Sequence, residues 1–192
     1  MSERKRFIKL IPLFSLLGVV MLTCVLLIVS GIANPFISSF AVDSEERLYI
    51  GLQGRIEVYD GNSIISTINP KTSRSYVFTI LEDDTILLST STTVYSMELN
   101  GNILDSWEDH GAQTYNDIQY SNLQYISRTG DRYTLDGILG WSRITKNDTV
   151  VMYSISVISF LVKVMLLASI VCLFSIVILL IKDRIAALKT AH

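Results

Sequence analysis

Apolar residues are concentrated in two long blocks near the ends of the chain, whereas the middle of the chain mixes apolar and polar positions. Leu10–Ala33 contains 24 residues without a charged side chain, and the second block covers residues 150–181 with one interruption at Lys163. A helix rises about 1.5 Å per residue, so the first block covers about 36 Å and crosses a hydrocarbon core of about 30 Å with some tilt. We therefore predict transmembrane helix 1 at residues 10–33, and a juxtamembrane segment followed by transmembrane helix 2 at residues 150–181.

The first block has a rival interpretation as a cleaved secretory signal peptide. Gly31-Ile32-Ala33 offers small residues at the spacing of a cleavage site. The apolar stretch is much longer than the roughly 7–15 residues of a signal-peptide core, which favours an uncleaved anchor.

Basic residues flank the two blocks at the ends of the chain. Lys and Arg close to a membrane span are retained on the cytoplasmic side. We therefore expect a two-pass protein of the plasma membrane, with cytoplasmic tails at residues 1–9 and 182–192 and with residues 34–149 outside. The basic residues concerned are Arg4, Lys5, Arg6, Lys9, Lys182, Arg184 and Lys189.

The segment between the blocks consists of short runs rich in Ile, Val, Tyr and Thr that are separated by Gly, Asn and Asp. Arg55–Tyr59 alternates polar and apolar residues with the period of a β-strand. Asp60-Gly61-Asn62 and Asn100-Gly101-Asn102 are typical of tight turns with positive φ. The pattern predicts an antiparallel β-meander, interrupted by a polar loop with a short helix at residues 108–122.

The predicted strands fall into an early and a late group. The early strands are Arg47–Gly51, Arg55–Tyr59, Ser63–Ile68, Tyr76–Leu81, Thr85–Ser89, Thr93–Leu99 and Asn102–Trp107. The late strands are Asn122–Ser127, Arg132–Leu135 and Ile138–Thr145, with turns predicted at Thr129-Gly130-Asp131 and Asp136-Gly137. The expected fold class is thus a membrane protein of the α+β class, with two transmembrane helices flanking an antiparallel β domain.

A weak internal repeat relates residues 48–65 to residues 86–104, at a spacing of 38 to 40 residues. This period suits a β-propeller blade. The residues AVDSEERLYIGLQGRIEVYDGNSIISTI resemble the repeats of NHL- and YVTN-type β-propellers, and the resemblance extends from Ala41 to Trp107. It implies a propeller-blade-like sheet and a binding role, without implying chemistry. Two or three blades do not close a ring of about four to eight, so either a small open sheet packs on itself or several chains complete one surface.

The charge balance of the middle segment excludes one class of partner. Residues 34–149 carry sixteen acidic and eight basic side chains, a balance of −8. Nucleic-acid binding needs a basic surface, so nucleic acid is not an expected partner. The expected partners are the lipid bilayer and either a protein partner or further copies of the chain.

The sequence offers no constellation typical of catalysis, cofactor binding or metal binding. The two cysteines, Cys24 and Cys172, lie in the apolar blocks, and His110 is the single histidine of the middle segment. We therefore predict no catalytic, cofactor-binding or metal site, and no cofactor. A hydrolase that uses Asp83, Asp84 or Asp109 remains an alternative, because a sequence does not show which carboxylates meet in space.

Three residues are candidates for a partner or ligand surface: Trp107, Trp141 and Lys163. Trp141 either packs on its sheet or binds a partner, and Lys163 either extends its stem toward water or lies on an ion path. The leading hypothesis is a non-enzymatic binding, scaffold or accessory subunit. The alternative is a ligand sensor or a component of a transport complex that works as an oligomer.

Overall fold

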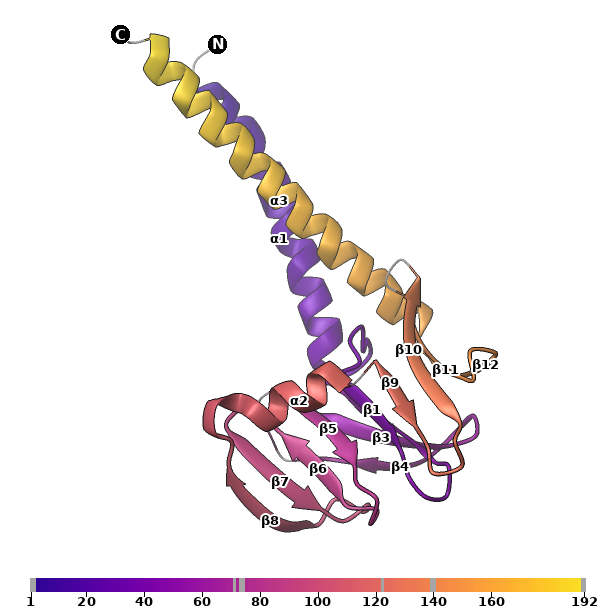
Figure 1. Cartoon of the computed structure of the whole chain (residues 1–192). Coiled ribbons are helices and arrows are strands. Elements are labelled where there is room, and N and C mark those ends of the chain that lie inside the picture. Colours follow the sequence, from indigo (N-terminus) through magenta and orange to yellow (C-terminus); the bar gives the residue numbers. More distant parts are fainter. Residues whose placement is uncertain (1–2, 71, 73–74, 122, 139–140, 191–192) are drawn as a thin grey trace. The chain divides into compact units, whose positions relative to one another are not determined.

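The computed structural model describes residues 3–70, 72, 75–121, 123–138 and 141–190. The chain is an α+β protein with two apolar helices that could span a membrane and with antiparallel sheets. It divides into a helical unit, Met1–Pro35 with Val157–His192, and a β unit, Phe36–Ser156. Figure 1 shows the elements of both units in sequence colours.

The helical unit consists of α1 (Glu3–Val29) and α3 (Val157–Thr190). Helix α1 ends earlier than the predicted span because Gly31 adopts a positive φ of 74°, which closes the helix through hydrogen bonds back to its last turn. Most of the large apolar side chains in the two spans are exposed within the chain. This arrangement is typical of helices whose outer surface meets lipid.

The two helices lie side by side (Figure 1) and share a small core. Cys24, Ala33 and Val162 are buried there, so Cys24 acts as a small apolar packing residue. The backbone N–H of Asn34 donates a hydrogen bond of 2.8 Å to Oγ of Ser159. This bond provides a partner for a backbone group beyond the end of α1.

The β unit is built from three separate four-stranded antiparallel sheets, each an up-and-down meander. Sheet 1 contains β1 (Ser39–Val42), β2 (Leu48–Leu52), β3 (Arg55–Asp60) and β4 (Ser63–Ile68). Sheet 2 contains β5 (Val77–Ile80), β6 (Ile86–Ser89), β7 (Thr93–Met97) and β8 (Ile103–Glu108). Sheet 3 contains β9 (Gln124–Ile126), β10 (Arg132–Ile138), β11 (Trp141–Lys146) and β12 (Val150–Ser154).

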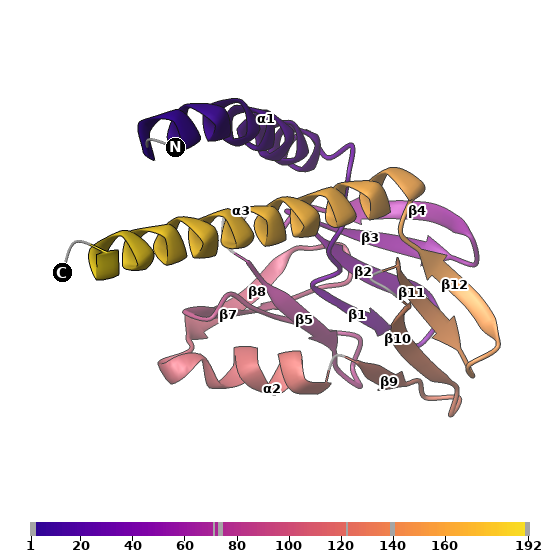
Figure 2. The same cartoon turned by 90° about the horizontal axis from the view of Figure 1, so that it is seen from above.

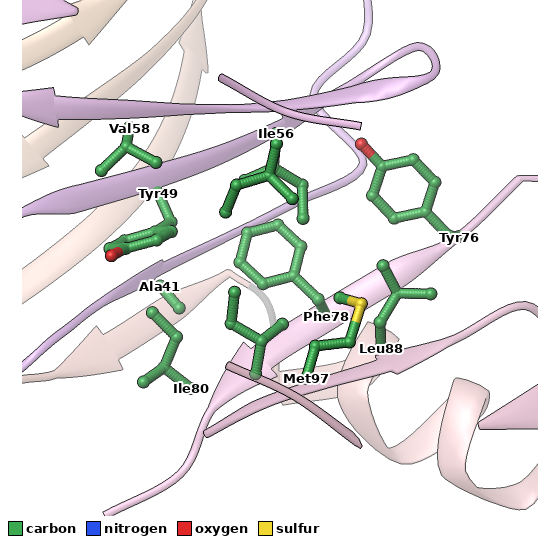
Figure 3. Packing of buried hydrophobic residues seen from close by; sticks show 11 residues of the cluster. Ala41, Tyr49, Ile56, Val58, Tyr76, Phe78, Ile80, Leu88 and Met97 are labelled. Atoms are coloured by element: carbon green, nitrogen blue, oxygen red, sulfur yellow. The ribbon is translucent and has the colours of Figure 1, made fainter. Parts of the chain in front are cut away.

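Sheet 1 is the middle layer, and its strands β1 and β2 are buried on both faces. One face packs on sheet 2 through a cluster drawn in Figure 3, in which Phe78 of β5 lies among residues of both sheets. The cluster comprises Ala41, Tyr49, Ile56, Val58, Ile68, Tyr76, Phe78, Ile80, Ile86, Leu88 and Met97.

The opposite face of sheet 1 packs on sheet 3. Strand alternation places Phe40, Ile50 and their neighbours on this face, where they meet Tyr133 of β10 and Ile144 of β11. At its margin the rings of Tyr59 and Tyr153 meet edge to face, with centroids 5.5 Å apart. The core of the β unit therefore has two layers of side chains, one on each side of sheet 1.

The 3₁₀ turn η1 (His110–Ala112) and helix α2 (Gln113–Ser121) follow sheet 2 and correspond to the predicted loop with a short helix. Helix α2 contacts β5 and lies beside sheet 2 in both Figure 1 and Figure 2. Its buried residue is Ile118.

The sequence predicted ten of the twelve strands that the structure describes, and there is a physical reason why each of the other two was missed. All four residues of β1 are buried, so this strand has no alternation. Strand β12 occupies residues 150–154 of the segment predicted as juxtamembrane, and α3 begins after it at Val157. The predicted turn at Asp136-Gly137 is wrong, because both residues lie inside β10 and pair with β11.

The internal repeat corresponds to matching strands in sheets 1 and 2. Residues 48–65 form β2, β3 and part of β4, and residues 86–104 form the equivalent β6, β7 and part of β8. Sheet 3 has the same meander, and each sheet has a bulge between its last two strands. The three sheets stack with sheet 1 in the middle and form no closed propeller among the described residues. The resemblance to NHL- and YVTN-type repeats stays a prediction.

Candidate functional site

The first hairpin of every sheet turns in the same way. In each turn the N–H of the first residue bonds to the carbonyl of the fifth, and the N–H of the fourth bonds to the carbonyl of the first. The fourth residue always has a positive φ: 63° at Glu46, 62° at Asp84 and 86° at Gly130. The three turns are residues 43–47, 81–85 and 127–131.

Side chains connect these three turns. The N–H and Oγ of Ser44 donate to the carboxylate of Asp84, at 3.0 and 2.5 Å. The guanidinium of Arg128 lies 3.2 Å from the same carboxylate, and Oγ1 of Thr129 donates to Glu46 at 2.7 Å. Each sheet is therefore bound to another sheet at this end of the β unit.

A second set of contacts extends the network into sheet 3. The hydroxyl of Tyr133 donates to Glu46 at 2.6 Å, and Nζ of Lys146 lies 3.2 Å from Glu46 and 2.6 Å from Asp131. The same Nζ lies 5.4 Å from the centre of the Tyr133 ring, within cation–π range. We call the three turns together with Tyr133 and Lys146 the three-turn cluster.

The electrostatics of the three-turn cluster hold its groups in their charged forms. Burial opposes ionisation of Glu46, but hydrogen bonds from Tyr133, Thr129, Ser127 and Lys146 bring the pKa of its carboxyl below the usual value. Hydrogen bonds from Ser44 lower the pKa of Asp84, and the bond from Lys146 lowers that of Asp131. The bond to Asp131 raises the pKa of Lys146. Groups held in this way are charge partners rather than proton-transfer groups at neutral pH.

The acidic residues considered for hydrolysis have structural contacts in the fold. Asp83 accepts the backbone N–H of Thr85, and Asp84 belongs to the three-turn cluster. Asp109 is buried and accepts three hydrogen bonds, from the N–H groups of Thr114 and Tyr115 in the first turn of α2 and from Oγ of Ser89. In the part of the chain that the structure describes, no three His, Cys, Asp or Glu side chains form a metal-binding group.

A cavity of about 550 Å³ lies beside the turn between β2 and β3. Its size is in the range of small-molecule sites. The described side chains around it carry no full charge at neutral pH, and the hydroxyl of Tyr76 lies 2.7 Å from the carbonyl of Leu52. The lining residues are Phe36, Ser38, Leu52, Gln53, Gly54, Thr72, Ser75 and Tyr76.

A smaller cavity of about 310 Å³ lies on sheet 3 and includes Trp141, one of the predicted surface residues. Arg143, Val151 and Ser154 complete its lining. The indole N–H of Trp141 donates a hydrogen bond of 2.6 Å to Oγ of Ser154, which fixes the ring against β12. We call this cavity the Trp141 pocket.

The other two predicted surface residues lie elsewhere. Trp107 is on β8, the outermost strand of sheet 2, where it is partly exposed opposite Val94. Lys163 lies on α3 inside the apolar span. Trp107 and Trp141 belong to different sheets and do not form one patch, and a binding role for any of the three stays a prediction.

The sequence interpretation missed an apolar surface on the outermost strands of sheets 1 and 2. Ile64 and Ile65 on β4, and Ile103 and Leu104 on β8, are each between 52% and 58% exposed. Each pair lies at the β-bulge of its sheet, where Ile65 and Leu104 are the extra residues of the outermost strand. Two adjacent apolar residues on an outermost strand are the signal that could have revealed this surface.

Comparison with known proteins leaves the family open. No family model matches the chain, and no curated protein matches it. A crystal structure of a protein of unknown function from Bacteroides caccae is similar at a TM-score of 0.32 and 13% identity, over 62% of this chain and 45% of that one. The chain thus spans less than half the length of that protein, and a likeness of this size does not establish a shared fold.

Proposed function

We propose that this chain is a two-pass protein of the plasma membrane whose β unit is a non-enzymatic binding or accessory subunit on the outer side. The observation that carries the proposal is the pair of apolar outermost strands, β4 and β8. Outermost strands of soluble monomers are usually protected by charged residues, because free strand edges attract other chains. Exposed apolar residues at such strands are typical of surfaces that contact another protein.

The three-turn cluster also supports the binding role, because it holds the three sheets together. Its carboxylates and ammonium group are bonded to one another and link all three sheets. A scaffold cross-linked in this way presents its outer strands in a fixed arrangement, so binding costs little ordering entropy.

The proposed orientation rests on the charges that flank the spans. Residues 1–9 and 182–192 are basic, whereas residues 34–149 carry an excess of acidic residues. Basic flanks stay in the cytoplasm, which leaves the β unit outside.

A second candidate function, a ligand sensor or a transport component acting as an oligomer, is favoured by one feature of the connections. Helix α1 leads into sheet 1, and sheet 3 leads into α3, so the two spans connect to different sheets. The contact between Glu46 and Lys146 joins these sheets. A ligand that breaks this contact would weaken the link between the two sheets that lead into the spans, and a sensor needs such a ligand-dependent change.

Site-specific photocrosslinking in the native membrane tests the binding proposal. A photoreactive residue replaces Ile65 or Leu104 in the full-length chain, and exposed Glu82 and Asp117 serve as control positions away from the outermost strands. We expect one reproducible adduct mass from the two outermost strands and a several-fold weaker yield from the controls. An adduct of twice the chain mass identifies a homo-oligomer. Equal yields at all four positions would contradict the proposal.

A further inference from the structure

The Trp141 pocket lies on the face of sheet 3 that is turned away from sheet 1. Trp141 and Arg143 are two residues apart on β11, so both side chains are on this face. Ser154 of β12 is directly opposite Arg143 and carries the hydroxyl bonded to Trp141. An indole, a guanidinium and a hydroxyl therefore surround a space of about 310 Å³.

Arg143 differs from the other basic residues of the β unit. Its Nε atom is buried without a hydrogen-bond partner, and within the described residues its side chain forms no ion pair, even with Asp136 opposite it on β10. All other arginines and lysines that the structure describes in this unit are paired with carboxylates. These are Arg47, Arg55, Arg128, Arg132 and Lys146.

A second buried polar atom on the same face lacks a hydrogen-bond partner. It is Oγ1 of Thr134, two residues before Asp136 on β10, so it shares this face without lining the pocket. Buried polar groups without partners are rare in folded proteins, and an external ligand is one of their standard explanations. Arg143 is half-buried, and its buried Nε lacks a partner. Such a guanidinium selects an anion with several oxygens, because its N–H groups form a fork that matches phosphate.

The connection to α3 indicates which phosphate is available. Ser154 precedes the first residue of the apolar span, Val157, by three positions, and three extended residues cover at most about 11 Å. Trp is enriched at the interface between water and lipid. Val151 of β12, which lines the pocket, is an exposed large apolar residue. A phospholipid offers both features, because its headgroup carries a phosphate and its acyl chains can contact the apolar residues beside the pocket.

We propose that the Trp141 pocket binds the phosphate of one phospholipid headgroup from the outer leaflet, with Arg143 as the phosphate ligand and Trp141 at the lipid boundary. This inference rests on the proposed membrane anchorage. The balance of −8 in residues 34–149 repels anionic membrane surfaces in general. Binding is therefore specific to the pocket rather than a general adsorption of the β unit.

Native mass spectrometry of the full-length chain in a mild detergent gives the first test. Wild type and Arg132→Gln are expected to retain one phospholipid per chain, and Arg143→Gln about tenfold less, since a hydrogen bond to a charged group contributes roughly this factor in affinity. Arg132→Gln removes the same charge from an exposed ion pair with Asp148 outside the pocket, which makes it the matched control. Circular dichroism checks that both variants are folded. Equal retention by the two variants would overturn the proposal.

Fluorescence of Trp141 separates a lipid phosphate from a free one. In a Trp107→Phe background, quenching of Trp141 by acrylamide is measured in nanodiscs of phosphatidylglycerol, of a phosphate-free glycosyl diacylglycerol, and of the latter with inorganic phosphate. Protection of Trp141 in the phosphatidylglycerol discs alone, lost on Arg143→Gln, supports the proposal. Equal protection by inorganic phosphate would reassign the pocket to a soluble anion and overturn the lipid assignment.

Alkaline carbonate extraction distinguishes this inference from the proposed function. Release of the chain from native membranes by carbonate would refute the anchorage, whatever Arg143→Gln does. Retention in the membrane together with unchanged lipid retention in Arg143→Gln would refute the Trp141 pocket alone.

Discussion

Glu46, in the first turn of sheet 1, is bonded to three side chains of sheet 3. It accepts hydrogen bonds from Thr129, Tyr133 and Lys146, which are 83 to 100 residues away in the sequence. The sequence did not predict a contact role for Glu46, because a glutamate beside Glu45 and Arg47 is typical of an exposed charged turn. Turn residues are readable from local pattern, whereas partners a hundred residues away are not.

Replacing Glu46 by Gln keeps the size of the side chain and removes its charge. We expect a loss of about 1–3 kcal/mol of unfolding free energy, because Lys146 and Tyr133 lose a charged acceptor. Urea unfolding of the full-length chain in detergent, followed by tryptophan fluorescence, measures the change. Glu45→Gln is the neighbouring control, since it removes an exposed pair with Arg47 and should change stability by less than about 0.5 kcal/mol. Equal losses in the two variants would contradict the role of Glu46.

The same carboxylates make stability depend on pH in a definite direction. The pKa values of Glu46, Asp84 and Asp131 are lower in the folded chain than their ordinary values near 4. Their contribution is therefore fully present above pH of about 5, and it is lost as the pH falls through the folded-state pKa values. When the pH is lowered below about 4, the urea concentration at the unfolding midpoint of wild type should decrease. The midpoint of Glu46→Gln should decrease less steeply.

At the scale of elements, the strands were readable where one face is polar and the turns need positive φ. Gly61, Gly101 and Gly130 have φ values of 57°, 91° and 86°, as the predicted turns require. The signal failed at β1, where both faces are buried, and at Gly137, which pairs inside β10. A glycine in a strand and a glycine in a turn look alike in sequence, and only the backbone conformation separates them.

Gly51 on β2 sits where sheet 1 and sheet 2 approach each other closely. A Cβ atom there would overlap Oγ of Ser38 and lie 3.0 Å from ring atom Cε1 of Phe78. We expect Gly51→Ala to lower the unfolding free energy by about 1–3 kcal/mol through overpacking. Gly137→Ala is the matched control, because its Cβ would meet other atoms at no less than 3.9 Å, and it should be neutral or slightly stabilising. Urea unfolding measures the unfolding free energy of both variants. An unchanged free energy in Gly51→Ala would contradict the tight contact.

At the scale of the whole molecule, the two apolar spans and the β domain between them were evident from composition, whereas the stacking of the sheets was not. Sheet 1 packs on sheet 2 through one face and on sheet 3 through the other, so its position depends on residues far along the chain. The sequence similarity between sheets 1 and 2 predicted two similar four-stranded units. It did not indicate which sheet lies between the other two.

Cysteine labelling tests the orientation of the whole chain. In a Cys24→Ala, Cys172→Ala background, Asn62→Cys in the exposed turn of β3 and β4 should react with a membrane-impermeant maleimide on intact cells. Lys189→Cys in the basic tail should react only after permeabilisation, because basic flanks remain in the cytoplasm. Labelling of both positions on intact cells, or the reverse pattern, would contradict the proposed topology.

The central place of sheet 1 determines when the β unit can finish folding. Phe40 of sheet 1 shares its cluster with Ile144 of sheet 3, so this contact closes a loop of about one hundred residues. In the proposed topology, one apolar face of sheet 1 remains uncovered during synthesis until the third sheet has been translocated, and α3 follows almost at once. We therefore expect the nascent domain to complete its core only when the second span is entering the bilayer, with an interval before this in which it depends on chaperones.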